Sequence, residues 1–210
     1  GATYGAVTLF LCRDFLIDGN RISGNIAATG AGICLPTCFN GRILNNLISE
    51  NRAEGENVFV GSGAGLYALI SQTPLGDALE DVLILNNTFI ENIAVDLIYL
   101  QGGWGGAMAL DILEERLLVA NNILAFNSSG IWKQAVNPNV PELFCNDVFD
   151  NPEGPGSDFN YVNLPPGPTD ISLDPLFADK AGGDYALQPE SPCIDSGDGT
   201  LTGLPTADID

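Results

Sequence analysis

The sequence predicts an all-β fold, a right-handed parallel β-helix of about five to six coils. Asparagine pairs with a fixed spacing recur along the chain, small-residue turns follow them, and β-branched and glycine residues are common in these stretches. Such residues are unfavourable inside helices. With 210 residues, of which 45% are apolar, the chain is long enough for one domain with a sizeable core.

The repeat consists of an asparagine, four other residues and a second asparagine. Successive second asparagines are separated by 26, 41, 35 and 24 residues. The two shorter steps fit one coil of a solenoid, and the two longer steps fit one coil with an inserted loop. The ten predicted ladder asparagines are Asn20, Asn25, Asn46, Asn51, Asn87, Asn92, Asn122, Asn127, Asn146 and Asn151.

Stacked coils bring equivalent residues about 4.8 Å apart, which is the spacing of paired strands. At this distance asparagine amides form hydrogen-bonded ladders along the stack. We expect the same asparagines to adopt the left-handed backbone conformation at the corners. Apolar residues beside them are expected to point inward, as for Leu83, Leu85, Phe89 and Ile93.

Residues 109–120 form the best helical window of the chain. We favour two strands joined by a charged turn at residues 114–116, and a short helical insert is the alternative. Overall, coils are expected over residues 1–151. A final coil and a loop-rich C-terminal cap are expected over residues 152–210, within the same domain.

Three motifs mark the C-terminal part. Asp174 to Phe177 reads Asp-Pro-Leu-Phe, Gly183 to Leu187 reads Gly-Asp-Tyr-Ala-Leu, and Ser191 to Asp198 reads Ser-Pro-Cys-Ile-Asp-Ser-Gly-Asp. This ending resembles the closing segment of bacterial right-handed parallel β-helix repeat proteins, often described as a choice-of-anchor domain. With the coils, the resemblance covers nearly the whole chain and implies a secreted or cell-surface protein.

Acidic residues outnumber basic ones by 27 to 7, which gives a formal charge of −20. Such a surface repels nucleic acid, so we expect no nucleic-acid partner. The absence of histidine excludes Ser-His-Asp, Cys-His and His-zinc chemistry. No apolar run reaches the length of a membrane-spanning helix. Because strand-like sequence begins at once, the chain is interpreted as a mature or trimmed product.

The five cysteines form no CxxC pair. Cys34 and Cys38 are candidates for a small disulfide loop, and Cys145 and Cys193 for a link between the last coils and the tail. The alternative is that all are small buried apolar residues. The composition favours an oxidising exterior.

Few residues are candidates for carbohydrate chemistry. Lys133 is the best candidate base, and both Lys133 and Trp104 are candidate glycan contacts, the latter in a glycine-rich loop. Glu50, Glu91 and Asp150 each precede a ladder asparagine, so stacking could gather them for hydrolysis or calcium binding, or they form a solvated acidic edge.

Calcium is the one cofactor that the sequence suggests. Asp195 and Asp198 lie in a flexible acidic turn, although the full spacing of a calcium loop is missing. A purely structural role for this turn is favoured, so no cofactor is firmly predicted.

These observations favour a structural or adhesive module of an extracellular protein. No capping helix precedes Tyr4, so exposed strand edges are expected to pair with other copies or cell-surface proteins, and end-to-end filaments are one outcome. The alternative is a polysaccharide lyase, a glycoside hydrolase or a glycan-binding module.

Overall fold

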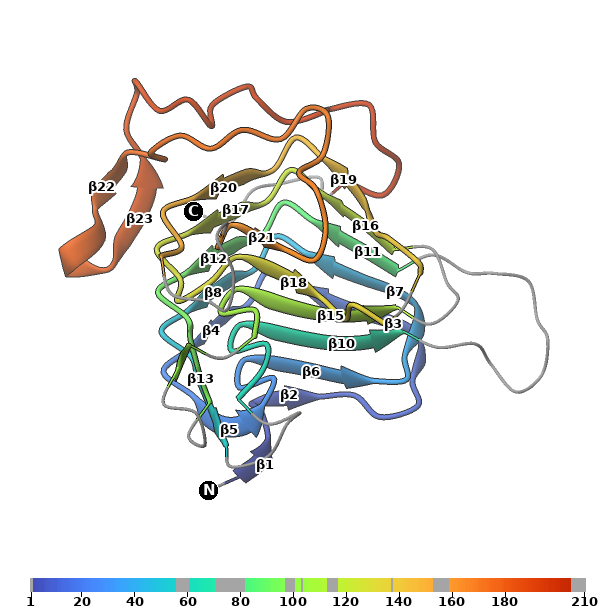
Figure 1. Ribbon diagram of the computed structural model, residues 1–210. Helices are drawn as coiled ribbons and strands as arrows, with labels where there is room; N and C mark the ends of the chain where they lie inside the picture. Colours follow the sequence, from blue (N-terminus) through green and yellow to red (C-terminus); the bar gives the residue numbers. More distant parts are fainter. Residues whose placement is uncertain are drawn as a thin grey trace.

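The computed structural model describes residues 2–55, 61–70, 82–96, 101–102, 104–112, 117–136, 138–152 and 159–204. These residues form an all-β fold of stacked parallel sheets, which confirms the predicted class at that level (Figure 1). Antiparallel pairing is restricted, among the described strands, to β13 with β14 and β22 with β23.

The strands fall into four parallel sheets and one hairpin. Sheet A contains β1 (Ala2–Tyr4), β5 (Ile26–Thr29), β9 (Arg52–Gly55), β13 (Ile93–Asp96) and β14 (Gln101–Gly102). Sheet B contains β2 (Val7–Thr8), β6 (Ile33–Pro36), β10 (Leu66–Ile70), β15 (Met108–Ile112), β18 (Ile131–Lys133) and β21 (Tyr161–Val162).

Sheet C contains β3 (Arg13–Asp18), β7 (Phe39–Leu44), β11 (Val82–Leu85), β16 (Leu117–Ala120) and β19 (Glu142–Phe144). Sheet D contains β4 (Arg21–Ser23), β8 (Leu47–Ser49), β12 (Thr88–Ile90), β17 (Ile123–Ala125) and β20 (Asp147–Phe149). The hairpin joins β22 (Phe177–Asp179) to β23 (Asp184–Leu187) through the 3-10 turn Lys180–Gly182.

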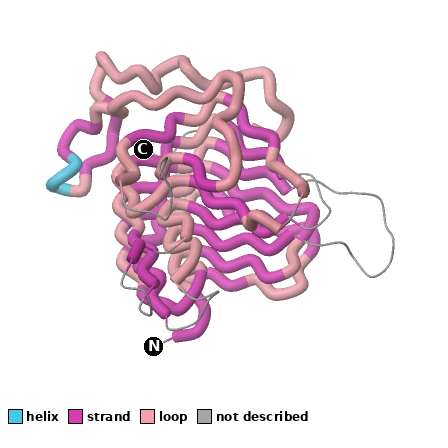
Figure 2. The backbone as a smooth tube through the Cα atoms, viewed as in Figure 1, coloured by secondary structure: helices cyan, strands magenta, loops and turns pink. Residues whose placement is uncertain are grey.

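The chain visits the sheets in a fixed order. From β3 it passes through sheets C, D, A and B, and the same order repeats from β7 and from β11. One such passage is called a circuit below. The circuits that start at β16 and β19 pass from sheet D to sheet B with no sheet A strand among the described residues. Figure 2 shows how the strands of successive circuits lie above one another.

Columns of apolar side chains fill the space between the sheets. In sheet C the column is Ile17, Ile43, Ile84, Val119 and Leu143, and each member pairs with the next and belongs to the main core cluster. β-Branched side chains suit this site because they pack well on a pleated surface. Burial of each such side chain contributes about 1.5–3 kcal/mol.

The predicted inward positions were only partly right. Phe89 lies in the core as expected. Leu83 and Leu85 lie instead on the outer face of sheet C, where they contact Leu201 and Leu204, and Ile93 is exposed. Side chains along a strand point alternately to its two faces. The inward residues of β11 are therefore Val82 and Ile84, which are the sequence neighbours of Leu83 and Leu85.

The tight corners place their left-handed residue one position earlier than predicted. The ladder asparagines are absent from the positive-φ residues, and the residue before each adopts that conformation, as Asn86 does before Asn87 with φ 56° and Glu91 before Asn92 with φ 55°. The equivalent residues include Gly19, Gly24, Asn45, Glu50, Asn121, Phe126, Cys145 and Asp150. The ladder asparagine is thus chosen for its amide rather than for its backbone.

The C-terminal part covers the side of the stack as well as its end. The β22–β23 hairpin packs on the outer face of sheet D through Phe177, Tyr185 and Leu187, beside β17 and β20 (Figure 1). Leu201 and Leu204 cover sheet C. At the end of the stack, Leu164 packs against the core.

Residues 109–112 and 117–120 are extended rather than helical. β15 continues to Ile112 and β16 begins at Leu117, which confirms the two strands. The predicted turn at 114–116 lies outside the described residues. The helical content of the described chain is one 3-10 turn, and no described helix is long and apolar enough to cross a membrane.

Candidate functional site

Two columns of asparagines run along both edges of sheet D, and they are buried except for Asn20 and Asn25 at one end. The first column contains Asn20, Asn46, Asn87, Asn122 and Asn146, and the second contains Asn25, Asn51, Asn92, Asn127 and Asn151. Within each column, Nδ2 donates to Oδ1 of the asparagine in the next circuit over 2.9–3.0 Å. The ten predicted residues are therefore joined by the ladder hydrogen bonds that the spacing suggested.

Asn87 illustrates how many hydrogen bonds each of these side-chain amides makes. Its Oδ1 accepts from both the backbone N and Nδ2 of Asn46, over 3.0 and 2.9 Å. Its Nδ2 donates to Leu85 O, Ile43 O and Asn122 Oδ1 over 3.0, 2.9 and 3.0 Å. A buried polar side chain with this many partners stabilises the corner, because it satisfies backbone groups that would otherwise be buried alone.

Sequence reasoning missed the residues that end the columns. Asn146 Nδ2 donates to Asp170 Oδ1 over 3.0 Å, and Asn151 Nδ2 donates to Asn160 Oδ1 over 2.8 Å. Asp170 Oδ2 accepts from the hydroxyl of Tyr161 and the backbone N of Gly167, over 2.8 and 2.9 Å. The signal was visible, since the step from Asn146 to Asp170 is 24 residues, the same as from Asn122 to Asn146.

The opposite ends of the columns are open. Asn20 and Asn25 each donate Nδ2 to the next circuit, and within the described chain no donor reaches the Oδ1 atom of either residue. The strands β1 to β4 likewise pair on one side only. Within the described residues, the outer edges of these four strands have no partner strand.

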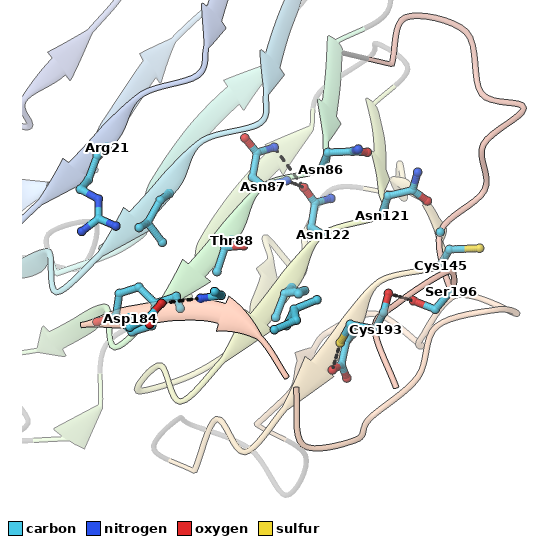
Figure 3. A pocket seen from close by; sticks show the side chains of 17 residues that line it. Arg21, Asn86, Asn87, Thr88, Asn121, Asn122, Cys145, Asp184, Cys193 and Ser196 are labelled. Carbon is cyan, nitrogen blue, oxygen red and sulfur yellow. Dashed lines mark hydrogen bonds between the residues drawn. The ribbon is translucent and has the colours of Figure 1, made fainter. Parts of the chain in front are cut away.

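A groove of about 570 Å³ lies on the outer face of sheet D (Figure 3). Its floor is one column of paired residues, Arg21, Leu47, Thr88, Ile123 and Asp147. Four strand spacings separate Arg21 from Asp147, so the floor is about 19 Å long. It carries a cation at one end and a carboxylate at the other.

The walls of the groove come from separate parts of the chain. One wall is the corner row, which we define as Asn45, Asn86, Asn121 and Cys145, and of which the last three line the groove. The other is β23, with Asp184 and Tyr185. Cys193, Ser196 and Gly197 also line it. The groove therefore exists only because the C-terminal segment folds back along the stack.

Two corner-row asparagines differ in their bonding. The side chain of Asn121 holds one residue of the C-terminal segment, because its Oδ1 accepts from Asp198 N over 2.8 Å and its Nδ2 donates to Asp198 O over 3.2 Å. Asn86, one circuit earlier, makes no side-chain hydrogen bond within the described chain, and its Oδ1 is buried. Its amide is the unsatisfied polar group of the groove wall.

Cys193 and the buried Asp147 form a hydrogen-bonded pair at one end of the groove floor. The thiol of Cys193 donates to Asp147 Oδ2 over 3.0 Å, and Leu173 N donates to Asp147 Oδ1. Burial, and then the bond to Asp147, raise the pKa of Cys193 to about 12. Burial also raises the pKa of Asp147, although the two donors oppose this effect. A thiol held in its protonated form is a poor nucleophile.

The predicted disulfides are absent, since all five cysteines are free. Cys193 bonds to Asp147, whereas the thiol of Cys145 lies 3.4 Å from Thr169 Oγ1. In the other pair, strand alternation places Cys34 on the outer face of sheet B, while Cys38 packs in the core and donates to Leu9 O. Burial is the main cause that raises the pKa values to about 12 and about 11, respectively.

The candidate glycan contacts do not share a surface. Trp104 packs against Trp132 on the outer face of sheet B, with ring centroids 5.4 Å apart. Lys133, the candidate base, is only 4% exposed and pairs with the inward residue Leu110. The alternation Ile131 in, Trp132 out, Lys133 in explains this placement. Lys133 Nζ donates to Gln134 O.

The carboxylate row is interrupted. Glu50 and Glu91 occupy the same corner of adjacent circuits, but Phe126 takes the next position and separates them from Asp150. Glu91 contacts Lys180 Nζ at 3.5 Å and the hydroxyl of Tyr185 at 3.5 Å. Burial, then Glu91 and Glu50, raise the pKa of Tyr185 to about 12. Glu91 thus helps to hold the hairpin.

The proposed calcium turn is bonded internally. Asp198 Oδ1 accepts from the backbone N and the hydroxyl of Thr200, over 2.8 and 2.6 Å, and these bonds lower the pKa of Asp198. Asp195 adopts a positive φ of 57°. No group of three or more acidic or cysteine side chains suited to a metal occurs among the described residues. Calcium binding stays a prediction.

Comparison with protein-family models, with curated proteins and with solved structures finds no match for this chain.

Proposed function

We propose that this chain is a right-handed parallel β-helix that serves as a structural or adhesive module of an extracellular or cell-surface protein. On this proposal it associates with a second copy of itself through the end of the stack that β1 to β4 form. The observation that supports it is the contrast between the ends of the stack: both asparagine columns are open at Asn20 and Asn25, whereas Asp170 and Asn160 continue and end them at the other side.

The exposed side chains of residues 2–26 agree with such a contact. Five large apolar side chains in the first 26 residues are exposed, with Phe10, Leu11 and Leu16 each about 60% exposed. Tyr4 and Ile26 are the other two. Apolar side chains beside unpaired strand edges favour association. A two-fold axis would place each copy's edge strands against those of the other copy.

The structure of the closed end is relevant to the end-to-end filaments that the sequence suggested. The 163–172 segment crosses that end, where Leu164 packs on the core and the backbone N of Gly167 bonds to Asp170. Association through one open end joins two copies, whereas a filament needs two complementary ends. Filaments stay a prediction, and a pairwise contact is the form that this geometry favours.

The alternative, a carbohydrate-active enzyme, receives less support. Lys133 is buried, and Phe126 interrupts the row of Glu50, Glu91 and Asp150. Lys133 and the predicted carboxylate row therefore do not converge in the way that lyase or hydrolase chemistry requires. Release of reducing ends or unsaturated products from a panel of neutral and uronic-acid polysaccharides would reinstate this alternative.

Light scattering after size-exclusion chromatography, over a hundredfold range of concentration, tests the proposal. We expect a concentration-dependent dimer that the Phe10→Lys/Leu16→Lys variant abolishes. Val136→Lys is the control, because Val136 is 82% exposed and lies outside the first circuit. A wild-type monomer at every concentration would overturn the proposed contact, and regular filaments in negative-stain micrographs would replace it with end-to-end assembly.

A further inference from the structure

The groove on sheet D is a binding site that the association of the open ends does not use. We propose that it binds an extended peptide segment, neutral or basic in charge, through the amide of Asn86. The floor of the groove spans the whole of sheet D, from Arg21 in β4 to Asp147 in β20. At about 3.3 Å per extended residue, its length of about 19 Å accommodates about six residues.

The corner row already recognises a peptide backbone in this structure. Asn121 grips both the N–H and the C=O of Asp198, so one side-chain amide satisfies both backbone groups of a single residue. Asn86 is the equivalent residue of the preceding circuit and shares its backbone conformation, with φ 56° at both positions. The same amide chemistry is thus repeated about 4.8 Å along the stack.

The Asn86 amide differs in having no partner. Its Oδ1 is buried without a hydrogen bond, and no described residue bonds to the side chain. An unsatisfied buried acceptor costs about 1–3 kcal/mol, and a bound N–H group would remove that cost. Because nothing holds the amide, it is able to turn about its Cβ–Cγ bond and present both polar atoms to the groove.

The other lining residues set the character of the ligand. Leu47 and Ile123 make part of the floor apolar, which suits the side chains of an extended peptide. Asp184 lies on the wall formed by β23, and Arg21 is the cation at one end. Within a chain of net charge −20, an acidic peptide would be repelled, whereas a neutral or basic one would not.

An array of capped hexapeptides of graded charge tests the inference, with neutral and uronic-acid oligosaccharides on the same slides. We expect binding to neutral and lysine-containing peptides and little to aspartate-containing ones. Asn86→Gly should weaken binding at least fivefold, because glycine keeps the left-handed corner but removes the amide. Asn45→Gly is the matched control, since Asn45 has φ 54° in the same row and does not line the groove.

A second variant blocks the groove without touching the corner row. Thr88→Trp places a large side chain on the floor and should abolish peptide binding, with circular dichroism and a thermal melt to establish folding. Peptide binding that is unchanged in Asn86→Gly would overturn the inference. So would the absence of peptide binding, or oligosaccharide binding that Thr88→Trp removes, which would make the groove a glycan site.

Discussion

The first and last circuits end their asparagine columns in opposite ways. At the first circuit, Asn20 presents an Oδ1 that no described donor reaches. At the last, Asn146 donates to Asp170 Oδ1, and Asp170 Oδ2 is held by Tyr161 and Gly167. Both ends belong to the same column, so the difference lies in one residue type and the segment around it.

The chemistry of the carboxylate explains the closed end. An asparagine both donates and accepts, so it passes the ladder on to the next circuit, whereas an ionised aspartate only accepts. Asp170 therefore receives the last donors of the first column and leaves no amide that requires a further partner. Hydrogen bonds to an ionised acceptor are also stronger than those between neutral groups. The first column is thus ended by changing one functional group, whereas the second ends at Asn160, whose Nδ2 donates to Ser172 Oγ over 3.2 Å.

The largest effect is expected at the middle of a column. Asn92→Ala removes the acceptor of Asn51 and the donor to Ile48 O, and leaves several buried groups unsatisfied. Chemical denaturation should show a loss of about 3–5 kcal/mol in the free energy of unfolding. Asn25→Ala at the open end should cost about 1 kcal/mol. Equal losses at the two positions would contradict the ladder account.

Asp170→Asn should open the closed end at an intermediate cost. The new amide still accepts from Asn146, but its Nδ2 replaces an acceptor and faces the backbone N of Gly167. We expect a loss of about 1–3 kcal/mol and faster proteolysis of the 163–172 segment. Asp184→Asn, on an exposed wall of the groove, is the control and should leave the stability within about 0.5 kcal/mol of the wild type.

The raised pKa of Asp147 predicts that the stability of the protein depends on pH through a group at the closed end of the stack. Because burial raises its pKa in the folded state, this group favours folding when protonated and loses that contribution as the pH rises from its ordinary pKa through the folded one. Asp147→Asn should therefore be more stable than the wild type at pH 7. Thermal melts of both proteins from pH 3 to pH 7 check this, and a difference that is constant with pH would count against it.

The smallest effect concerns the C-terminal segment. Asn121→Gly removes the two bonds to Asp198 while keeping the left-handed corner, where φ is 56°. We expect a loss of about 0.5–1.5 kcal/mol and earlier proteolytic cleavage between residues 193 and 204. Asn45→Gly makes the same backbone change away from Asp198. If it released the segment equally, the grip of Asn121 would not be the cause.

The sequence predicted the part of the fold that repeats. The spacing of the asparagines identified ten ladder residues because the same side chain must recur in every circuit. Their φ values were assigned to the wrong position, since glutamate and phenylalanine as well as asparagine occupy the left-handed corner, at Glu50 and Phe126. Residue type alone therefore does not reveal which position adopts that conformation.

The groove could not be predicted in this way. It is formed where the β22–β23 hairpin and residues 193–197 fold back along sheets C and D, and these contacts join residues far apart in the sequence. Lys133 was harder to place for a smaller reason. Its strand has only three residues, so the face to which each side chain points depends on the pairing with the partner strand. Asp170 follows Asn146 by the same 24-residue step as the ladder residues, but an aspartate does not fit a repeat that is defined by asparagine.

Hydrogen–deuterium exchange of the native protein, at a dilution where it is monomeric, tests the contrast between the two ends most directly. The account predicts that amides in residues 13–25, at the open end, lose protection well before those in residues 142–150, which the 163–172 segment covers. Equal protection at the two ends, or faster exchange in residues 142–150, would contradict it.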